Sequence, residues 1–479
     1  MSDNLDPNDW EAFRASSHRA LEHMIDFLQG AREQPVWRNT PPRVRQRFQS
    51  LLPRQPREFD DVLEDFETNI KPYAVGNTHP LFMGWVHGAG TPVGMVAEML
   101  AAGLNANCGG RNHVGIEVER QITRWAAELL GFPQSSTGVF VTGSSAANFL
   151  GLLVARDAAL GHEVRGSGLF ASGKQLVAYT SVHAHGCVTQ AMELAGAGSA
   201  HLRPIPADSA GRIRTDLLQA AIDRDLAAKL SPFLIVGTAG TVDTGAIDPL
   251  QSLAQIAREY GLRFHVDGAF GALAALSAAL KPRLAGIELA DSIALDFHKW
   301  AHVPYDAGFL LVRDGEMHRG TFASAAAYLQ RAPRGLAAGD VWPCDLGPDL
   351  SRGFRALKTW FTFQVHGADR LGAAIEASCD NACYLADSLS RSKIFELRAP
   401  VSLNIVCFAL KAGWPDQANQ AIVIDLQERG LAAPSMTNVL GRPVIRAAIV
   451  NHRTTKADID LFAVALHEAA GRLRPDSWS

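Results

Sequence analysis

Lys299 is the residue of this sequence with the clearest capacity for covalent chemistry. It lies in Asp296-Phe297-His298-Lys299-Trp300, directly after the apolar run 292–295. A single lysine in such surroundings usually lays its stem on apolar surface while its amine reaches water. When the amine is buried beside other polar groups its pKa falls, and it becomes a nucleophile that forms Schiff bases with carbonyl compounds. The other polar motifs of the chain decide between these two interpretations.

A second motif, His265-Val266-Asp267-Gly268-Ala269, ends an apolar run with a carboxylate. Asp267 could be an ordinary helix N-cap. Beside a pyridine cofactor it would instead pair with the protonated ring nitrogen and keep the ring an electron sink. The small side chain of Ala269 would then let a flat ring lie against the backbone.

The phrase Thr142-Gly143-Ser144-Ser145-Ala146 joins an apolar run to a helical pattern. It has neither the Gly-Lys-Ser/Thr of a Walker loop nor the Gly-x-Gly-x-x-Gly of a dinucleotide-binding fold. Small hydroxyl residues at a helix N-terminus make a good phosphate cradle, because backbone N–H groups and the helix dipole face the anion. A capped helix that binds nothing is the alternative.

The segment Val182-His183-Ala184-His185-Gly186-Cys187 contains three residues of types that bind metals. A helix is expected to begin within it, however, and no acidic residue stands nearby to orient the imidazoles. The sequence therefore predicts no metal site, and His185 is better suited to stacking on a flat ring. The turn 237–245, which contains Thr241, is either a cofactor-lining loop or an ordinary glycine-rich turn.

Each of these motifs lies at the end of a short apolar run that has the length of a buried strand. Helical patterns separate several of the runs, which is typical of a doubly wound α/β sheet whose ligands bind at the carboxyl ends of the strands. The expected strands are 138–142, 175–180, 233–238, 263–266, 292–295 and 307–312, and helices are expected at 146–159, 215–230 and 249–260.

The flanking parts of the chain have other patterns. Residues 314–347 give weak structural signals, and loops of this length are often functional lids. A long helix at 354–389 then leads into alternating strands and helices that predict a small α+β domain. Amphipathic helices are predicted at 10–28, 44–52, 59–70, 92–104 and 115–130, and the C-terminal alternation comprises strands 404–410 and 443–450 and helices 421–429 and 456–473.

The composition narrows the class of protein. The chain has 479 residues, of which 47% are hydrophobic and 20% charged, and its net charge is −4. This balance argues against nucleic acid or an anionic membrane as the main partner. No apolar run approaches the roughly 20 residues that span a bilayer. The acidic start Met1-Ser2-Asp3 is unlike a targeting peptide, and the six scattered cysteines fit free thiols, so we expect a cytoplasmic protein.

Taken in order, the phrases TGSSAAN, SVHAH, GTAGTVDTG, HVDGA and DFHKW resemble those of the group II pyridoxal 5′-phosphate (PLP)-dependent decarboxylases. This family includes aromatic-L-amino-acid, histidine and glutamate decarboxylases. The resemblance implies PLP fold type I, an α/β architecture with a mostly parallel seven-stranded sheet in a large domain. It also implies a homodimer with active sites at the interface. We expect an N-terminal helical segment (1–84), a large PLP-binding domain (85–364) and a small C-terminal domain (365–479).

The resemblance also implies a role for each matching residue. Lys299 would carry PLP as a Schiff base, Asp267 would pair with its pyridine nitrogen, and His185 would stack on the ring above Ala269. Ser144 and Ser145 would hold the phosphate with His298, and Thr241 and Asp296 would line the site. In the long loop, Ala327-Tyr328-Leu329-Gln330 resembles the motif whose tyrosine protonates the substrate carbanion. TGSSAAN departs from the family by having serine and alanine where relatives often have glycine and methionine.

The resemblance implies an L-amino acid as substrate, and the sequence defines its side chain only loosely. Phe82, Trp85, Arg111 and His113 are expected to border its pocket. Phe82 and Trp85 favour an aromatic side chain, whereas Arg111 could favour an acidic one. Decarboxylation to the amine and CO₂ is the expected reaction, since aldehyde-forming relatives often have phenylalanine in place of the loop tyrosine. The alternatives are an aldehyde synthase, an aminotransferase and a catalytically inactive regulatory protein of the same fold.

Overall fold

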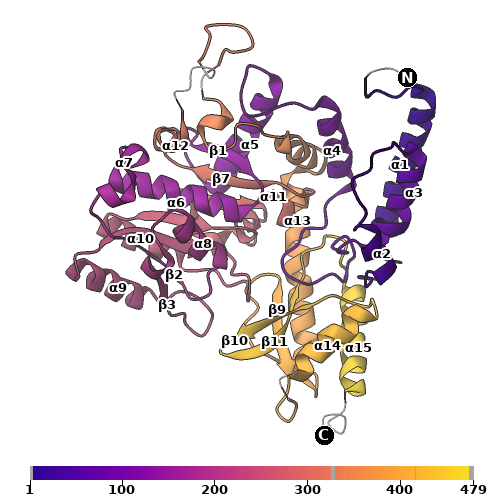
Figure 1. Ribbon diagram of the computed structural model, residues 1–479. Helices are drawn as coiled ribbons and strands as arrows, with labels where there is room; N and C mark the ends of the chain where they lie inside the picture. The colour runs from indigo at the N-terminus through magenta and orange to yellow at the C-terminus, as the bar shows by residue number, and fades with distance from the viewer. Residues whose placement is uncertain (1–3, 325–329, 340, 416, 474–479) are drawn as a thin grey trace.

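The computed structural model describes residues 4–324, 330–339, 341–415 and 417–473. Two β-sheets, each covered by helices, occupy different parts of the chain (Figure 1). The larger sheet has seven strands in the order β1-β7-β6-β5-β4-β2-β3. Its strands are β1 (Thr137–Val141), β2 (Leu176–Ser181), β3 (Leu202–Ile205), β4 (Ser231–Thr238), β5 (Arg263–Asp267), β6 (Ser292–Asp296) and β7 (Gly308–Val312).

The direction of the strands brings the loops after β1, β2, β4, β5 and β6 to one edge of this sheet. The pairs β2–β3, β2–β4, β4–β5 and β5–β6 are parallel. Strand β7 is antiparallel to both β6 and β1, so β1 runs in the same direction as β6. The carboxyl ends of parallel strands meet at the same edge, which is where such sheets bind ligands.

The apolar runs form strands because the sheet is buried on both faces. All residues of β2, β6 and β7 are buried, and the six expected strands are confirmed within one or two residues at either end. Strand β3 was not predicted, because Arg203 and Pro204 interrupt its apolar pattern at the sheet edge. The covering helices are α4 (Pro92–Leu104), α5 (Val114–Leu130), α6 (Ser144–Leu160), α7 (Val164–Ala171), α8 (Gly186–Leu194), α9 (Thr215–Ala227), α10 (Leu250–Tyr260), α11 (Phe297–Trp300) and α12 (Gly315–Phe322).

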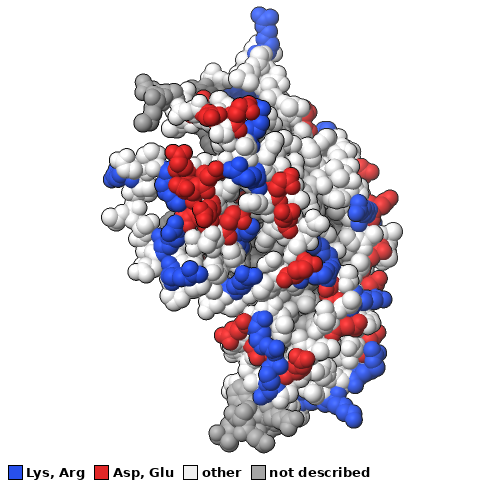
Figure 2. All heavy atoms as spheres, turned by 90° about the vertical axis from the view of Figure 1, so that its right-hand side faces the viewer, with Lys and Arg blue, Asp and Glu red and all other residues white. Residues whose placement is uncertain are grey.

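The N-terminal segment consists of the helices α1 (Trp10–Gln29), α2 (Pro42–Arg47) and α3 (Phe59–Asn69). Helices α1 and α3 lie side by side along one side of the molecule (Figure 1). The expected helix 44–52 was wrong in its bounds, since α2 begins at the proline pair and ends at Arg47. Figure 2 views this side, and there basic and acidic side chains are interspersed rather than gathered by sign.

The long helix α13 (Arg355–Ser390) runs from the large sheet to the smaller one (Figure 1). It is kinked at Gly367, whose φ of 72° is left-handed. The boundary proposed at residues 364 and 365 falls within this helix and close to its kink. The domain division itself stays a prediction.

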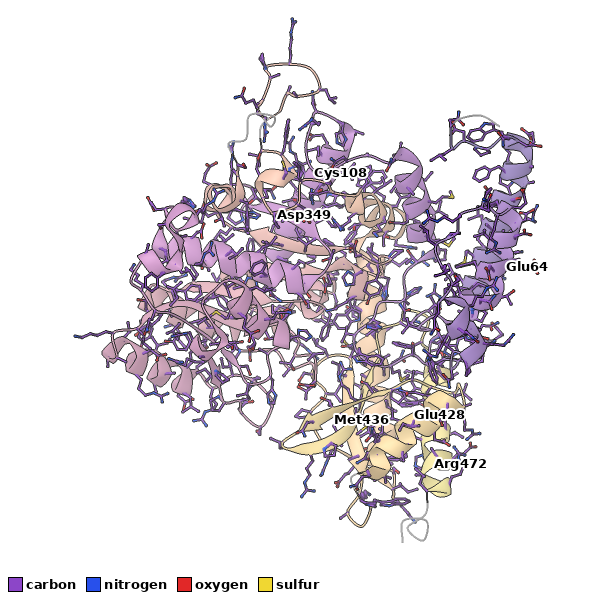
Figure 3. All side chains as sticks on the ribbon, in the orientation of Figure 1. Glu64, Cys108, Asp349, Glu428, Met436 and Arg472 are labelled. Carbon is purple, nitrogen blue, oxygen red and sulfur yellow. The ribbon has the colours of Figure 1, made fainter. Side chains whose placement is uncertain are left out.

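The smaller sheet has the order β10-β11-β9-β8 and is antiparallel throughout. Figure 3 labels Met436 on this sheet and Glu428 and Arg472 on the helices beside it. Strands β8 and β10 were not predicted, because they are short and alternate poorly. The elements are β8 (Phe395–Leu397), β9 (Ile405–Leu410), α14 (Gln417–Glu428), β10 (Ser435–Val439), β11 (Arg442–Ala448) and α15 (Lys456–Arg472).

Three further findings concern the described residues as a whole. None of their helices combines the length and the apolar character that a membrane span requires. No group of three or more histidine, cysteine or acidic side chains within them has an arrangement that could hold a metal ion. All six cysteines are free thiols.

Candidate active site

A cavity of about 360 Å³ opens at the edge of the large sheet where the strands end. The loops after β1, β2, β4, β5 and β6 contribute to it, together with the segment 85–87 that lies between α3 and α4. Its lining contains Trp85, Val86, His87, Thr142, Gly143, Ser144, Ser145, His185, Cys187, Thr238, Gly240, Val242, Asp267, Ala269, Phe270, Asp296, His298, Lys299 and Tyr305.

Lys299 stands in the short helix α11 that follows β6. Its side chain is 21% exposed, and its Nζ lies 3.0 Å from Oδ2 of Asp296. The same carboxylate accepts hydrogen bonds from the backbone N–H (2.6 Å) and the hydroxyl (2.7 Å) of Ser144. Asp296 thus links the Lys299 amine to the N-terminus of α6. Its partner there, Ser144, is 152 positions away in the sequence. The buried anion and the helix terminus stabilise each other electrostatically.

Asp267 ends β5 and is buried on the floor of the cavity. Burial raises the pKa of its carboxyl, and the charge of Lys299 and the Ala269 N–H, which donates to Oδ1 at 3.1 Å, act in the opposite direction. A protonated nitrogen brought against this carboxylate would lower that pKa further and hold the pair ionised.

Two imidazoles of the cavity have defined tautomers. His185 is the N-cap of α8, and its Nδ1 accepts from the Cys187 N–H at 3.2 Å. His298 Nδ1 accepts from the Ala307 N–H at 3.0 Å, and burial lowers the pKa of His298 to about 4. A neutral His298 therefore carries its proton on Nε2, which lies 3.7 Å from Asp296. His185 is exposed and lines the cavity together with the small Ala269.

Several predicted residues lie elsewhere than at this cavity. Thr241 is buried, and its hydroxyl contacts Thr244 (3.1 Å) and accepts from Ala246 N–H (3.0 Å), so it holds the turn together instead of facing the cavity. Phe82 is buried behind the lining, with its ring 5.6 Å from that of His87.

Arg111 and His113 are also not among the residues that line the cavity within one chain. The Arg111 guanidinium lies over the Trp342 ring at 4.8 Å, and His113 caps α5 by accepting from the Gly115 N–H. Their place at a substrate pocket stays a prediction. Tyr328 lies outside the described residues.

Sequence reasoning missed His87 and Tyr305, both of which line the cavity. The Tyr305 ring packs 4.3 Å from that of His298, and burial raises its pKa to about 12. A tyrosine six residues beyond a reactive lysine was the available signal. His87 stands two residues after Trp85, in the segment already expected at the pocket.

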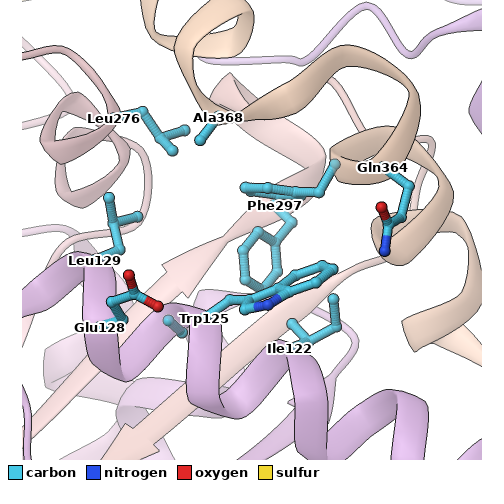
Figure 4. Close-up of a pocket in the computed structure, with 10 residues that line it drawn as sticks. Ile122, Trp125, Glu128, Leu129, Leu276, Phe297, Gln364 and Ala368 are labelled. Carbon is cyan, nitrogen blue, oxygen red and sulfur yellow. The ribbon is translucent and has the colours of Figure 1, made fainter.

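A second cavity, of about 280 Å³, lies between α5 and α13 (Figure 4). Its lining is mostly apolar, and Phe297 forms part of it, directly before His298 in the chain. Glu128 and Gln364 are its polar lining residues. No amine, imidazole, thiol or hydroxyl joins Glu128 in the lining, so the cavity lacks the converging polar groups of the first one.

The polar groups that line the first cavity are of the types that bind PLP. It combines an amine, a buried carboxylate whose Oδ1 accepts from the Ala269 N–H, an exposed imidazole and the hydroxyl-rich N-terminus of α6. These are the groups that a pyridine aldehyde with a phosphate arm requires. Fold and cavity together define a PLP-dependent enzyme of fold type I.

Comparison with known proteins specifies the family. Residues 41–411 match the model of the pyridoxal-dependent decarboxylase conserved domain. The chain is 30% identical to an aromatic-L-amino-acid decarboxylase of Bacillus atrophaeus over 96% of this chain and 95% of that protein. It is 28% identical to a phenylacetaldehyde synthase of Arabidopsis thaliana, with 93% of each chain covered.

Solved structures share the fold. The Oryza sativa protein TDC, solved with PLP and tryptamine, has a TM-score of 0.90 at 24% identity, over 98% of this chain and 100% of that one. Mouse CSAD also has a TM-score of 0.90 at 24% identity, over 96% and 99% of the two chains. The chain belongs to the pyridoxal-dependent decarboxylase family. It is a PLP-dependent carboxy-lyase that acts on an amino acid, as the sequence predicted.

Proposed function

We propose that this enzyme converts an aromatic L-amino acid to its amine and CO₂, with Lys299 as the covalent attachment point of the cofactor. The observation that carries the proposal is the convergence of Lys299, Asp267, His185 and Ser145 on one cavity. Bound PLP supplies an electron sink that accepts the pair left at Cα when the carboxylate departs.

The residues of the chain have separate tasks in this proposal. Asp267 would hold a proton on the pyridine nitrogen, and His185 and Ala269 would hold the ring between them. Ser144, Ser145 and His298 surround the phosphate at the N-terminus of α6. Asp296 orients the Lys299 amine, and it fixes Ser144 through two hydrogen bonds. Thr241 stabilises the turn 241–246 through its contacts with Thr244 and Ala246.

Tyr328 is the proposed donor of the proton that replaces CO₂ on Cα, because a phenol is a neutral donor at pH 7. Tyr305, whose ring lies against His298, is the matched control. Tyr328→Phe should lower amine formation by roughly 100-fold and divert product to aldehyde, with O₂ consumed as the oxidant and ammonia and H₂O₂ released. Tyr305→Phe should change amine yield less and form no aldehyde. Equal loss of amine formation in both variants would contradict the proposal that Tyr328 is the proton donor.

The lining favours an aromatic substrate over an acidic one. Trp85, Val242, Phe270 and Tyr305 offer apolar and aromatic surface. Of the described residues that line the cavity, Lys299 is the one lysine or arginine, and its amine is engaged with Asp296. A side-chain carboxylate would therefore be buried without a cation, which is costly.

The aldehyde synthase is the second candidate, because a relative of that name covers 93% of the chain. An aminotransferase and an inactive regulatory protein are weaker alternatives. Absorbance of the lysine-bound cofactor, bleached by borohydride, followed by an amino-acid panel assayed for CO₂, amine and O₂ uptake, separates all four. CO₂ with stoichiometric amine supports the proposal. O₂ uptake with aldehyde formation would indicate an aldehyde synthase, and turnover that depends on a keto acid would indicate an aminotransferase. Absence of bound cofactor would indicate the inactive regulatory protein.

We further propose that the enzyme is a cytoplasmic homodimer. Helices α1 and α3 expose Trp10, Phe13, Phe59 and Val62, and such a contiguous apolar surface is typical of an interface. A second copy of the chain would cover it and could bring Arg111 or His113 to a neighbouring active site. Light scattering should give twice the 51.5 kDa of one chain, and Val62→Glu should shift the mass towards the monomer. A monomeric wild type would contradict the proposal.

A further inference from the structure

His87 is the one ring of the described cavity lining that the proposed chemistry leaves without a task. Its imidazole packs against the rings of Phe82 and Trp85, with centroids 5.6 Å from each and interplanar angles of 12° and 20°, and those two rings are 6.2 Å from each other. The Tyr305 ring approaches edge-on at 6.1 Å. Three aromatic neighbours therefore fix the plane of His87 before any ligand arrives.

The backbone around His87 is equally constrained. A side chain at Gly88 would meet the carbonyl oxygen of His298 at 1.9 Å, so this segment lies directly on the backbone of α11. The Asn77 amide donates to the Gly88 carbonyl at 2.7 Å. On the other side, Trp85 has a φ of 51°, and its carbonyl accepts from Arg446 at 2.9 Å. His87 is thus held beside Lys299 by packing that leaves it little freedom.

The electrostatics make this imidazole neutral. Burial and the charge of Lys299 both lower the pKa of His87, so at neutral pH it offers one N–H donor and one acceptor. Within the part of the chain that the structure describes, no group hydrogen-bonds to either ring nitrogen. A rigid, neutral imidazole that lines the cavity and has no hydrogen-bond partner among the described residues is suited to a neutral polar partner, and it does not favour an anion.

We infer that His87 determines specificity by hydrogen-bonding a polar group on the substrate's aromatic ring, a phenol hydroxyl or an indole N–H. The inference rests on the proposed decarboxylation of aromatic amino acids. A site built to hydrogen-bond such a group discriminates against the analogue that lacks it, because the site's own polar atoms would then be left unpaired. Phenylalanine should accordingly be the poorest of the common aromatic substrates.

The test uses the PLP-loaded enzyme and L-tyrosine, L-tryptophan and L-phenylalanine. His87→Phe keeps a flat ring in the stack and removes both hydrogen-bonding atoms. The ratio of kcat/KM for tyrosine, tryptophan or both over phenylalanine should fall by roughly 10- to 100-fold, mainly through KM. His87→Gln should recover part of the ratio. His201→Phe, a substitution on the short helix 199–201 away from the cavity, should leave the ratio at the wild-type value.

The arms separate the possible results. A change confined to tyrosine identifies a hydroxyl as the recognised group, and a change confined to tryptophan identifies the indole N–H. Unchanged ratios in His87→Phe, or a wild type without preference over phenylalanine, would overturn the inference while the decarboxylase proposal stands. Release of CO₂ from non-aromatic amino acids alone would instead overturn the proposed substrate, and the role of His87 with it.

Discussion

Two cavities border the four-residue helix α11, and they differ in what holds their walls. Phe297 lines the cavity between α5 and α13, whose other walls are mostly apolar side chains (Figure 4). His298 and Lys299 line the cavity at the sheet edge, where Asp296 and Ser144 fix the polar groups by hydrogen bonds. The cavity between α5 and α13 is therefore shaped by side-chain packing. At the cavity of the sheet edge, the ends of several strands bring charged groups into contact. The following predictions test this difference.

The largest effect is expected from Lys299→Ala, which removes the amine that would carry the cofactor. Decarboxylation should fall by roughly 1,000-fold or more, because the covalent route is lost. The visible absorbance of lysine-bound PLP should disappear while circular dichroism is unchanged. Lys281→Ala, on the short helix 281–284, is the matched control. Retained absorbance in Lys299→Ala would show that another residue carries the cofactor.

Asp267→Asn should reduce kcat by roughly 100- to 1,000-fold, because the neutral amide cannot hold the proton on the ring nitrogen. Covalent attachment to Lys299 should persist, which separates this variant from the previous one. Steady-state measurement of CO₂ release at saturating substrate would give the loss in kcat. A kcat within a few-fold of the wild type would mean that the carboxylate serves as a structural cap for the Ala269 N–H.

Phe297→Ala tests the apolar cavity. The side chain is buried against Phe140 and Phe309, so its removal should lower the free energy of unfolding by about 3–5 kcal/mol. Urea unfolding followed by tryptophan fluorescence would measure the change. A loss below about 1 kcal/mol would indicate that the neighbouring rings close the space.

The smallest effect is expected from a histidine beneath the polar cavity. His265 contacts Ser292 and Asn148 at 2.7 Å each, and burial lowers its pKa to about 4. Because the unfolded chain binds a proton near pH 6.5 and the folded one does not until about pH 4, stability is fully present above pH 6.5 and falls as pH drops from 6.5 to 4.

His265→Gln keeps hydrogen-bonding groups at this position and removes the titration. Its stability should decline less than that of the wild type between pH 6.5 and 4, by on the order of 2 kcal/mol. Thermal unfolding at half-unit pH steps would measure the difference. Parallel pH profiles for the two proteins would contradict a neutral buried His265.

The prediction from sequence succeeded where local pattern determines structure. Apolar runs of five or six residues are buried strands, and the polar residue that ends each run must reach the carboxyl edge of a parallel sheet. Lys299, Asp267 and Ser145 could therefore be assigned to one cavity. Strand β3 was missed because Arg203 and Pro204 break its pattern, and only its pairing with β2 makes it a strand.

The tertiary structure alone decided which groups touch. The sequence by itself determined the family and the positions of six strands of the large sheet, and it predicted the cofactor-binding motifs at their ends, since these depend on residue types and short spacings. It could not show that Asp296 binds Ser144, that Thr241 turns inward, or that Arg111 lies over Trp342 instead of at the cavity of its own chain. Those contacts join residues far apart in the chain, and only the packing of the sheet, α11 and the segment 85–88 sets them. His87 gained its place beside Lys299 for the same reason.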